Sequence, residues 1–333
     1  MRMCGRVQWV LCPAAIAAIL AVSCGPAAPA KTDGPKGQEP SSGNETSLVV
    51  PVPDPTETAT TDSPPPDTKT ETPASKVQIV AIDPCIDALR TDAGGPDPSK
   101  ATGLEIYRDG LDAERQNKKD IARRKYLQLI QNNPDSTLVP ATYFAFGEMF
   151  RLEAVSDPVK VSLAQQSYAE VLKYPAGKGT FWGVSQYRLG QVLLGSKPQE
   201  ALAAFAKAIK TKQLYPGDGC ADLLMFNAVD ASAAAYAEVA ETDKCVSFYQ
   251  SVTNDAGATA IACVTVAQKL AEKKKGAEAQ RAIAASLQPA AKAKMDSIQL
   301  ASFCQRAQDA ATAARASGGT NATLDKALGA ACP

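Results

Sequence analysis

The chain has 333 residues, with 35 basic and 35 acidic side chains, no histidine, nine cysteines and 23 prolines. The lack of histidine excludes Ser-His and Cys-His nucleophile pairs and almost every catalytic zinc site, and the balanced charge offers no electrostatic footprint for nucleic acid. Aromatic residues make up only 6 % of the chain, so we expect an aliphatic, alanine-rich core, which favours helices.

Residues 1–23 have the pattern of an export signal, with two arginines followed by an apolar run that is too short to span a bilayer. Small residues lead into Cys24, which resembles the lipobox of bacterial lipoproteins. The resemblance implies cleavage before Cys24, acylation of that cysteine and, because Gly25 rather than aspartate follows, sorting to the outer membrane with the body facing the periplasm. The alternative is ordinary cleavage near Ala28, which would discard Cys24. Removal of the signal leaves 33 basic against 35 acidic residues.

A linker of residues 24–76 follows, and 11 of the 23 prolines lie between positions 25 and 75. Its large apolar residues are too few to compensate the entropy of ordering, so we expect a disordered tether that spans roughly 40 Å as a random coil. Residues 77–102 form a lead-in. At its start the β-branched run 76–82 indicates a short strand or, without a pairing partner, an extended segment, and a helical turn is expected from Pro84 to Arg90.

Residues 103–216 contain three internal repeats. Each has a glycine with an aromatic residue three positions earlier, and then a second helix with a small residue, an aromatic four residues on and an apolar residue three further on. The first helices carry Tyr107 and Gly110, Phe144 and Gly147, and Tyr187 and Gly190; the second carry Ala122 and Tyr126, Ala164 and Tyr168, and Ala201 and Phe205. We expect the glycine to let the second helix approach at its small residue. Asp157-Pro158 and a capping box from Ser196 to Gln199 are predicted to begin two of the second helices.

The repeats resemble tetratricopeptide repeats (TPRs), and more closely the variety in the Tol-Pal-associated periplasmic protein and the Bam-complex outer-membrane lipoprotein. The resemblance implies a solenoid of helical hairpins whose first helices line a concave groove that binds a peptide or helix. Carried over by position, the groove candidates are Tyr107, Leu111, Glu114, Arg115, Phe144, Glu148, Arg151, Tyr187 and Gln191. The alternative is that the three aromatic residues are buried packing residues and the neighbouring charges a solvated face.

An alanine-rich helical tail, residues 217–333, is expected to contain helices at roughly 219–240, 242–253, 257–274, 277–286, 290–316 and 321–331. Six cysteines remain after the signal and the lipidated residue are set aside, and an even number in an exported chain indicates disulfides. Cys245 and Cys263 lie nine residues on either side of position 254, and Cys304 and Cys332 lie 14 residues on either side of Gly318. Equal distances from a turn place side chains at the same height on antiparallel helices, so these pairs are predicted. The remaining pair, Cys85 with Cys220, would tie the lead-in to the tail. The alternative is six free thiols.

The sequence thus predicts an all-α chain: a TPR-like helical-hairpin solenoid followed by a disulfide-linked helical tail and preceded by the disordered tether. No catalytic motif, cofactor or metal site is expected. The leading hypothesis is a non-catalytic lipoprotein scaffold of the bacterial cell envelope that binds other envelope proteins through the groove. The rival hypothesis is a lipoprotein that binds a ligand or peptidoglycan through its C-terminal helical region.

Overall fold

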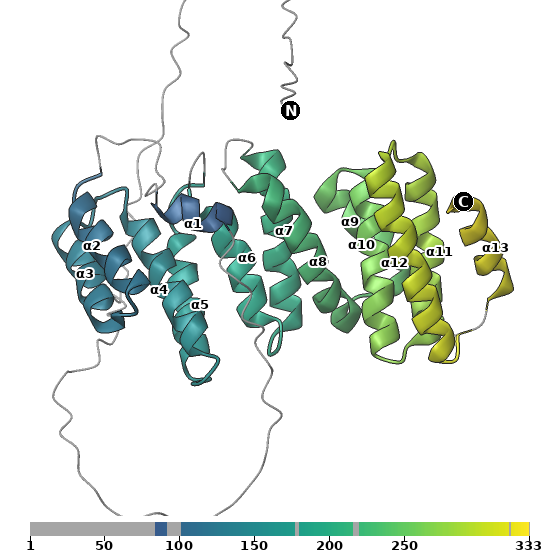
Figure 1. Ribbon diagram of the computed structural model, residues 1–333, viewed down its shortest axis with the longest axis horizontal. Helices are drawn as coiled ribbons and strands as arrows, with labels where there is room; N and C mark the ends of the chain where they lie inside the picture. The colour runs from purple at the N-terminus through teal and green to yellow at the C-terminus, as the bar shows by residue number, and fades with distance from the viewer. Residues whose placement is uncertain (1–83, 92–100, 177–179, 216–219, 320, 333) are drawn as a thin grey trace, which may run out of the picture. The chain divides into compact units, whose positions relative to one another are not determined.

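The protein is described from a computed structural model, which covers residues 84–91, 101–176, 180–215, 220–319 and 321–332. Every regular element in these ranges is helical, as predicted (Figure 1). The helices are α1 (Pro84–Thr91), α2 (Leu104–Arg115), α3 (Lys119–Asn132), α4 (Val139–Glu153), α5 (Lys160–Val171), α6 (Trp182–Leu193), α7 (Pro198–Leu214), α8 (Ala221–Val239), the short 3-10 helix η2 (Thr242–Lys244), α9 (Cys245–Thr253), α10 (Ala256–Glu272), α11 (Gly276–Lys292), α12 (Ser297–Ala316) and α13 (Ala322–Ala331). The expected signal peptide, the tether and the segment 76–82 lie outside the described residues.

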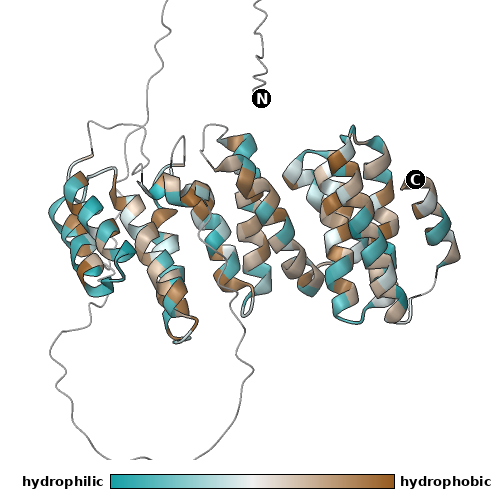
Figure 2. Cartoon of the chain, viewed as in Figure 1, coloured by the Kyte–Doolittle hydropathy of each residue, from teal (hydrophilic) through white to brown (hydrophobic). Residues whose placement is uncertain are grey.

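The three predicted repeats form helical hairpins, α2 with α3, α4 with α5 and α6 with α7, and each hairpin packs on the next. The middle hairpin is enclosed by its neighbours: α4 contacts both α3 and α5, and ten of its 15 residues are buried. Figure 2 accordingly shows fewer hydrophilic residues on α4 than on α2 and α3. The hairpins therefore share one continuous hydrophobic core, which extends through α7 into α8.

Each repeat glycine lies against the aromatic ring of the second helix. A Cβ atom added at Gly110 would lie 2.5 Å from the Tyr126 ring, one at Gly190 would lie 2.6 Å from Phe205, and one at Gly147 would overlap Tyr168 in the same way. We expected the glycine to let the second helix approach at its small residue. The structure shows instead that the aromatic ring of the second helix occupies the space that the glycine leaves.

The aromatic three residues before each glycine packs against the same ring. The centroid distances are 5.9 Å for Tyr107 and Tyr126, 5.7 Å for Phe144 and Tyr168, and 6.1 Å for Tyr187 and Phe205. Such tilted pairs stabilise a core beyond their buried area. The repeated sequence pattern therefore encodes a repeated packing unit of one glycine and two rings.

We expect Gly147→Ala to lower the free energy of unfolding by about 1–3 kcal/mol, because the added methyl group overpacks a rigid site. Tyr168 cannot yield easily, since its ring is fully buried and its hydroxyl is hydrogen-bonded to Glu148. Urea unfolding followed by circular dichroism measures the change. Gly329→Ala in α13 is the matched control, because no atom lies within 4 Å of its Cβ position and alanine favours a helix. Equal effects at the two sites would contradict the packing unit.

The tail is organised around α10, which packs against α8, α9, α11 and α12. Its buried positions surround most of the helix, as expected for the central element of a helical bundle. Because α8 contacts both α7 and α10, it joins the hairpins to the tail.

The predicted disulfide pairing is confirmed in full. The Cα atoms are 5.9 Å apart in Cys85–Cys220, 5.8 Å in Cys245–Cys263 and 5.5 Å in Cys304–Cys332. Two of the three bonds staple neighbouring tail helices, whereas Cys85–Cys220 connects α1 to the residue before α8.

Three local predictions were wrong. Pro289 lies inside α11 rather than between two helices. It stands near the end of α11, where the loss of one backbone N–H donor does not end the helix. The break falls at residues 293–296, before α12. The capping box from Ser196 does not form, since α7 begins at Pro198 after Lys197 without a side-chain cap. At Asp157 the carboxylate accepts the N–H of Val159 at 3.1 Å, but α5 begins only at Lys160.

Candidate functional site

Most of the predicted groove residues are in the interior. Tyr107 and Phe144 are fully buried, and the others with less than a tenth of their surface exposed are Leu111, Glu148, Arg151 and Tyr187. The prediction that these six side chains line an open groove is therefore corrected: the packing alternative holds for the aromatics, because each pairs with a second-helix ring. Glu114 and Gln191 are partly exposed, and only Arg115 is exposed.

The buried charge of Glu148 is held by a cluster from three helices. Arg151, one turn further along α4, donates to both carboxylate oxygens at 3.2 and 3.0 Å, and Tyr168 of α5 donates its hydroxyl at 2.5 Å. Arg188 Nε of α6 lies 3.0 Å from Oε1 as an ion pair, without hydrogen-bond alignment. Burial by itself raises the pKa of Glu148, but the charges of Arg188 and Arg151 outweigh it and lower the pKa from 4.5 to about 2. This cluster ties the second hairpin to the third.

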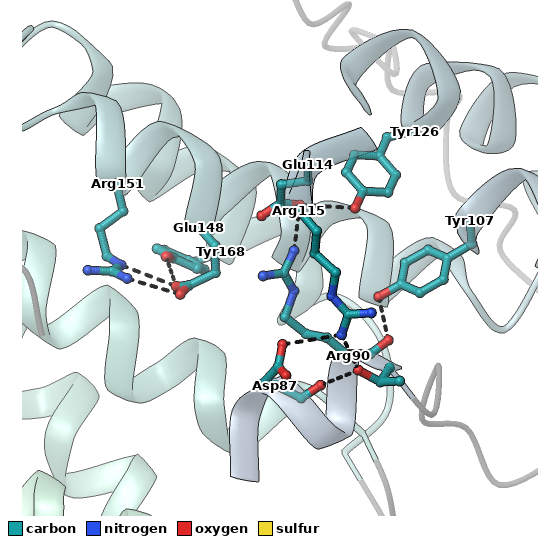
Figure 3. Close-up of polar contacts among 10 residues, drawn as sticks. Asp87, Arg90, Tyr107, Glu114, Arg115, Tyr126, Glu148, Arg151 and Tyr168 are labelled. Atoms are coloured by element: carbon teal, nitrogen blue, oxygen red, sulfur yellow. Dashed lines mark hydrogen bonds and ion pairs between the residues drawn. The ribbon is translucent and has the colours of Figure 1, made fainter. Parts of the chain in front are cut away.

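A second cluster, around Glu114 at the end of α2, includes Arg90, which is not among the residues predicted from the sequence. Arg90 of α1 is 4 % exposed and donates to Glu114 Oε2 at 2.6 Å, and Tyr126 donates to the same oxygen at 3.0 Å (Figure 3). Burial lowers the pKa of Arg90, but the adjacent carboxylate of Glu114 outweighs it and raises the pKa overall. Arg90 therefore remains charged and paired.

The end of α1 is further held by α2 side chains. The Tyr107 hydroxyl donates to the backbone carbonyl of Arg90 at 3.1 Å, and burial raises the pKa of Tyr107 to about 12, so it stays a donor. Arg115 donates to Thr91 Oγ1 at 2.7 Å and lies 3.6 Å from Asp87 (Figure 3). Three predicted groove residues, Tyr107, Glu114 and Arg115, thus contact a helix after all, and it is the chain's own α1.

The apolar face of α1 is buried together with these contacts. Ile86 is 1 % exposed and Leu89 is 8 % exposed, and both belong to the hydrophobic core that includes the repeat aromatics. At the other end of the helix, Cys85 is bonded to Cys220. We call Tyr107, Glu114, Arg115 and Cys220 the α1 seat. In the described part of the chain these residues hold α1.

Two open cavities of about 410 Å³ lie elsewhere. One is between the α3–α4 and α5–α6 turns, with a lining rich in proline and aromatic side chains: Pro134, Pro140, Tyr174, Pro175, Phe181 and Trp182. The other lies among α7, α8 and α9, where Tyr236 and Phe248 supply rings and Glu241 and Lys244 supply charge. No local sequence pattern marks either cavity, because each combines residues from separate turns or helices.

Among the described residues no group of three or more histidine, cysteine, aspartate or glutamate side chains is placed to hold a metal ion. In the same part of the chain, no helix combines the length and apolar character that a membrane span requires. No family model, no curated protein and no solved structure matches the chain.

Proposed function

We propose that the protein is a non-catalytic scaffold of the bacterial cell envelope that binds other envelope proteins through its TPR-like helical hairpins. The observation that carries the proposal is the α1 seat, where side chains of the first hairpin hold the arginine and a last-turn carbonyl of an amphipathic helix whose apolar residues are buried. Helix recognition of this kind is a recurring mode of protein interaction. The lack of histidine in the sequence also favours a scaffold over an enzyme.

The proposed location is the outer membrane, facing the periplasm, with a lipid on Cys24 and the tether as spacer. The lipobox-like sequence before Cys24 supports the anchor, and Cys24 itself lies outside the described residues. The three disulfides support export, because such bonds persist in oxidising compartments.

A second candidate function is the binding of a ligand or peptidoglycan fragment by the C-terminal helical region. It is favoured by the cavity among α7, α8 and α9, where aromatic rings stand beside a charged pair. Rings with adjacent polar groups are the usual lining of small-ligand sites.

Photo-crosslinking in living cells separates the two functions. In the variant Cys85→Ser/Cys220→Ser, in which no disulfide holds α1, a photoreactive residue at position 115 of the α1 seat is expected to capture a protein partner. Position 326, an exposed residue of α13, serves as the control and is expected to capture none. The same probe at position 244 reports on the cavity near α9.

In the same cells Cys24→Ala is expected to move the protein from the membrane to the soluble fraction.

Protein adducts at position 115 that are absent at 326 support the scaffold. Adducts with glycan at position 244 alone would favour the second function, and adducts at all three positions alike would indicate unspecific capture and contradict the scaffold.

A further inference from the structure

We propose that α1 is a resident ligand of the α1 seat, and that opening the Cys85–Cys220 disulfide lets a partner helix of the same chemistry take its place. The partner helix carries two apolar residues three positions apart, followed directly by arginine, as Ile86, Leu89 and Arg90 do. The physiological partner rests on the proposed scaffold function, whereas the chemistry of recognition rests on the contacts of α1.

The contacts that hold α1 are those of a receptor with a ligand. Its two apolar residues are buried, its arginine forms a charge-assisted hydrogen bond with Glu114, and the Tyr107 hydroxyl satisfies a carbonyl of its last turn. Charge-assisted hydrogen bonds to arginine add geometric specificity as well as energy. Any helix that presents the same three groups meets the same complementary surface.

The helical form of α1 depends on this surface. A helix of eight residues does not persist alone in water, because nucleation is costly and few hydrogen bonds compensate it. The backbone connection from α1 to α2 runs through residues 92–100, so α1 is joined to the hairpins by that segment and by the disulfide. Whether α1 stays bound to the α1 seat therefore depends on the Cys85–Cys220 disulfide, which a reductant can open.

The disulfide is more accessible to a reductant than Cys245–Cys263, and it shares this partial exposure with Cys304–Cys332. Cys85 is partly exposed, although its partner Cys220 is buried, whereas both sulfurs of Cys245–Cys263 belong to fully buried residues. A dithiol reductant would attack the Cys85 sulfur as a thiolate, form a mixed disulfide and release Cys220 as a thiolate that takes up a proton. The second thiol of the reductant then displaces Cys85. Two electrons and two protons pass to the protein, and the reductant becomes a disulfide.

The bond decides whether a partner in solution can compete. While it is closed, α1 cannot leave the seat. Once it is open, α1 competes only through the effective concentration that a short connection provides, of the order of millimolar. A partner helix that binds better than α1 then displaces it. The oxidised protein is the closed form and the reduced protein the receptive form.

Peptide binding to the purified full chain tests the proposal. The probe is a fluorescent peptide of residues 84–91 with Cys85→Ser, and fluorescence anisotropy measures its affinity. The receptive form is the variant Cys85→Ser/Cys220→Ser that also carries Ile86→Ser/Leu89→Ser, so that its own α1 no longer competes. The matched control is Cys304→Ser/Cys332→Ser, which loses a different partly exposed disulfide and keeps α1 in place.

We expect the receptive variant to bind at least about tenfold more tightly than the oxidised wild type and the control, because only there is the seat free. A peptide with Arg90→Ala, or a receptor with Glu114→Gln, is expected to lose about tenfold in affinity. Equal binding to all proteins, or a peptide indifferent to Arg90, would overturn the proposal.

Amide hydrogen exchange keeps the test decisive if the receptive variant is damaged. On adding dithiothreitol to the wild type, exchange at residues 84–91 is expected to rise while α2 to α6 remain protected. Unchanged protection of α1 would contradict the proposal that opening the Cys85–Cys220 disulfide releases α1. Peptide binding without any crosslinked partner at position 115 would contradict the proposed scaffold function but not the proposed recognition of α1. A crosslinked partner without peptide binding would contradict the proposed recognition of α1 and leave the scaffold function standing.

Discussion

Replacing Cys85 and Cys220 by alanine is expected to lower the free energy of unfolding by about 5 kcal/mol, whereas replacing Cys245 and Cys263 lowers it by about 3 kcal/mol. The difference follows from the sequence separations of 135 and 18 residues, because a disulfide that closes a longer loop removes more entropy from the unfolded chain. Guanidinium chloride unfolding of each double variant, followed by circular dichroism, measures the two values.

The Cys304–Cys332 pair supplies an intermediate case, with a separation of 28 residues. Its removal is expected to cost slightly more than that of Cys245–Cys263. If Cys85–Cys220 proves the least stabilising of the three disulfides, loop entropy would not govern its contribution to stability. The native contacts of α1 would then hold the helix in place without the disulfide.

Replacing Glu148 by alanine is expected to cost about 3–5 kcal/mol of stability, because it leaves two buried arginines without their carboxylate. Arg151 and Arg188 are both less than 5 % exposed, and apart from Glu148 the Arg188 guanidinium donates a hydrogen bond to Gln191. The control is Glu272→Ala on α10, where the pair with Lys269 is exposed and a loss below about 1 kcal/mol is expected. Urea unfolding at neutral pH compares the two variants.

The same carboxylate has a pH signature. Its pKa of about 2 in the folded protein lies below the ordinary 4.5, so its contribution is complete above about pH 4.5 and is lost as the pH falls toward 2. The shift corresponds to about 3 kcal/mol. Glu148→Gln cannot ionise at this position, so its unfolding free energy should fall less than that of the wild type across this window. Parallel curves for the two proteins would show that Glu148 is not the group responsible.

The hairpins and disulfides were predictable because their signals are local. The glycine and aromatic positions repeat at helical spacing within each hairpin. They set which faces of the two helices pack together, independently of the rest of the chain. The cysteine pairs 245–263 and 304–332 follow from equal distances to a turn, and Cys85–Cys220 then follows by elimination. Pro289 shows the limit of such signals, since a proline in the last turns of a helix is tolerated and does not mark its end.

The candidate site was only half visible from the sequence. Tyr107, Glu114 and Arg115 were selected by position, but Arg90 was missed because its partner Glu114 lies 24 residues away on another helix. The one available signal was the pair Ile86 and Leu89, which gives α1 an apolar face that must be covered by something. Periodicity shows that a face is apolar and does not show which segment covers it.

The sequence by itself therefore determined the helical class, the hairpin packing unit and the cysteine pairing, because each depends on spacing within one or two neighbouring helices. The tertiary structure decided that most of the expected groove is interior, that Glu148 is neutralised by arginines from two helices, and that α1 occupies the seat. These outcomes depend on contacts between segments far apart in the chain, whose free energies are set by burial and pairing in three dimensions and leave no periodic trace in the sequence.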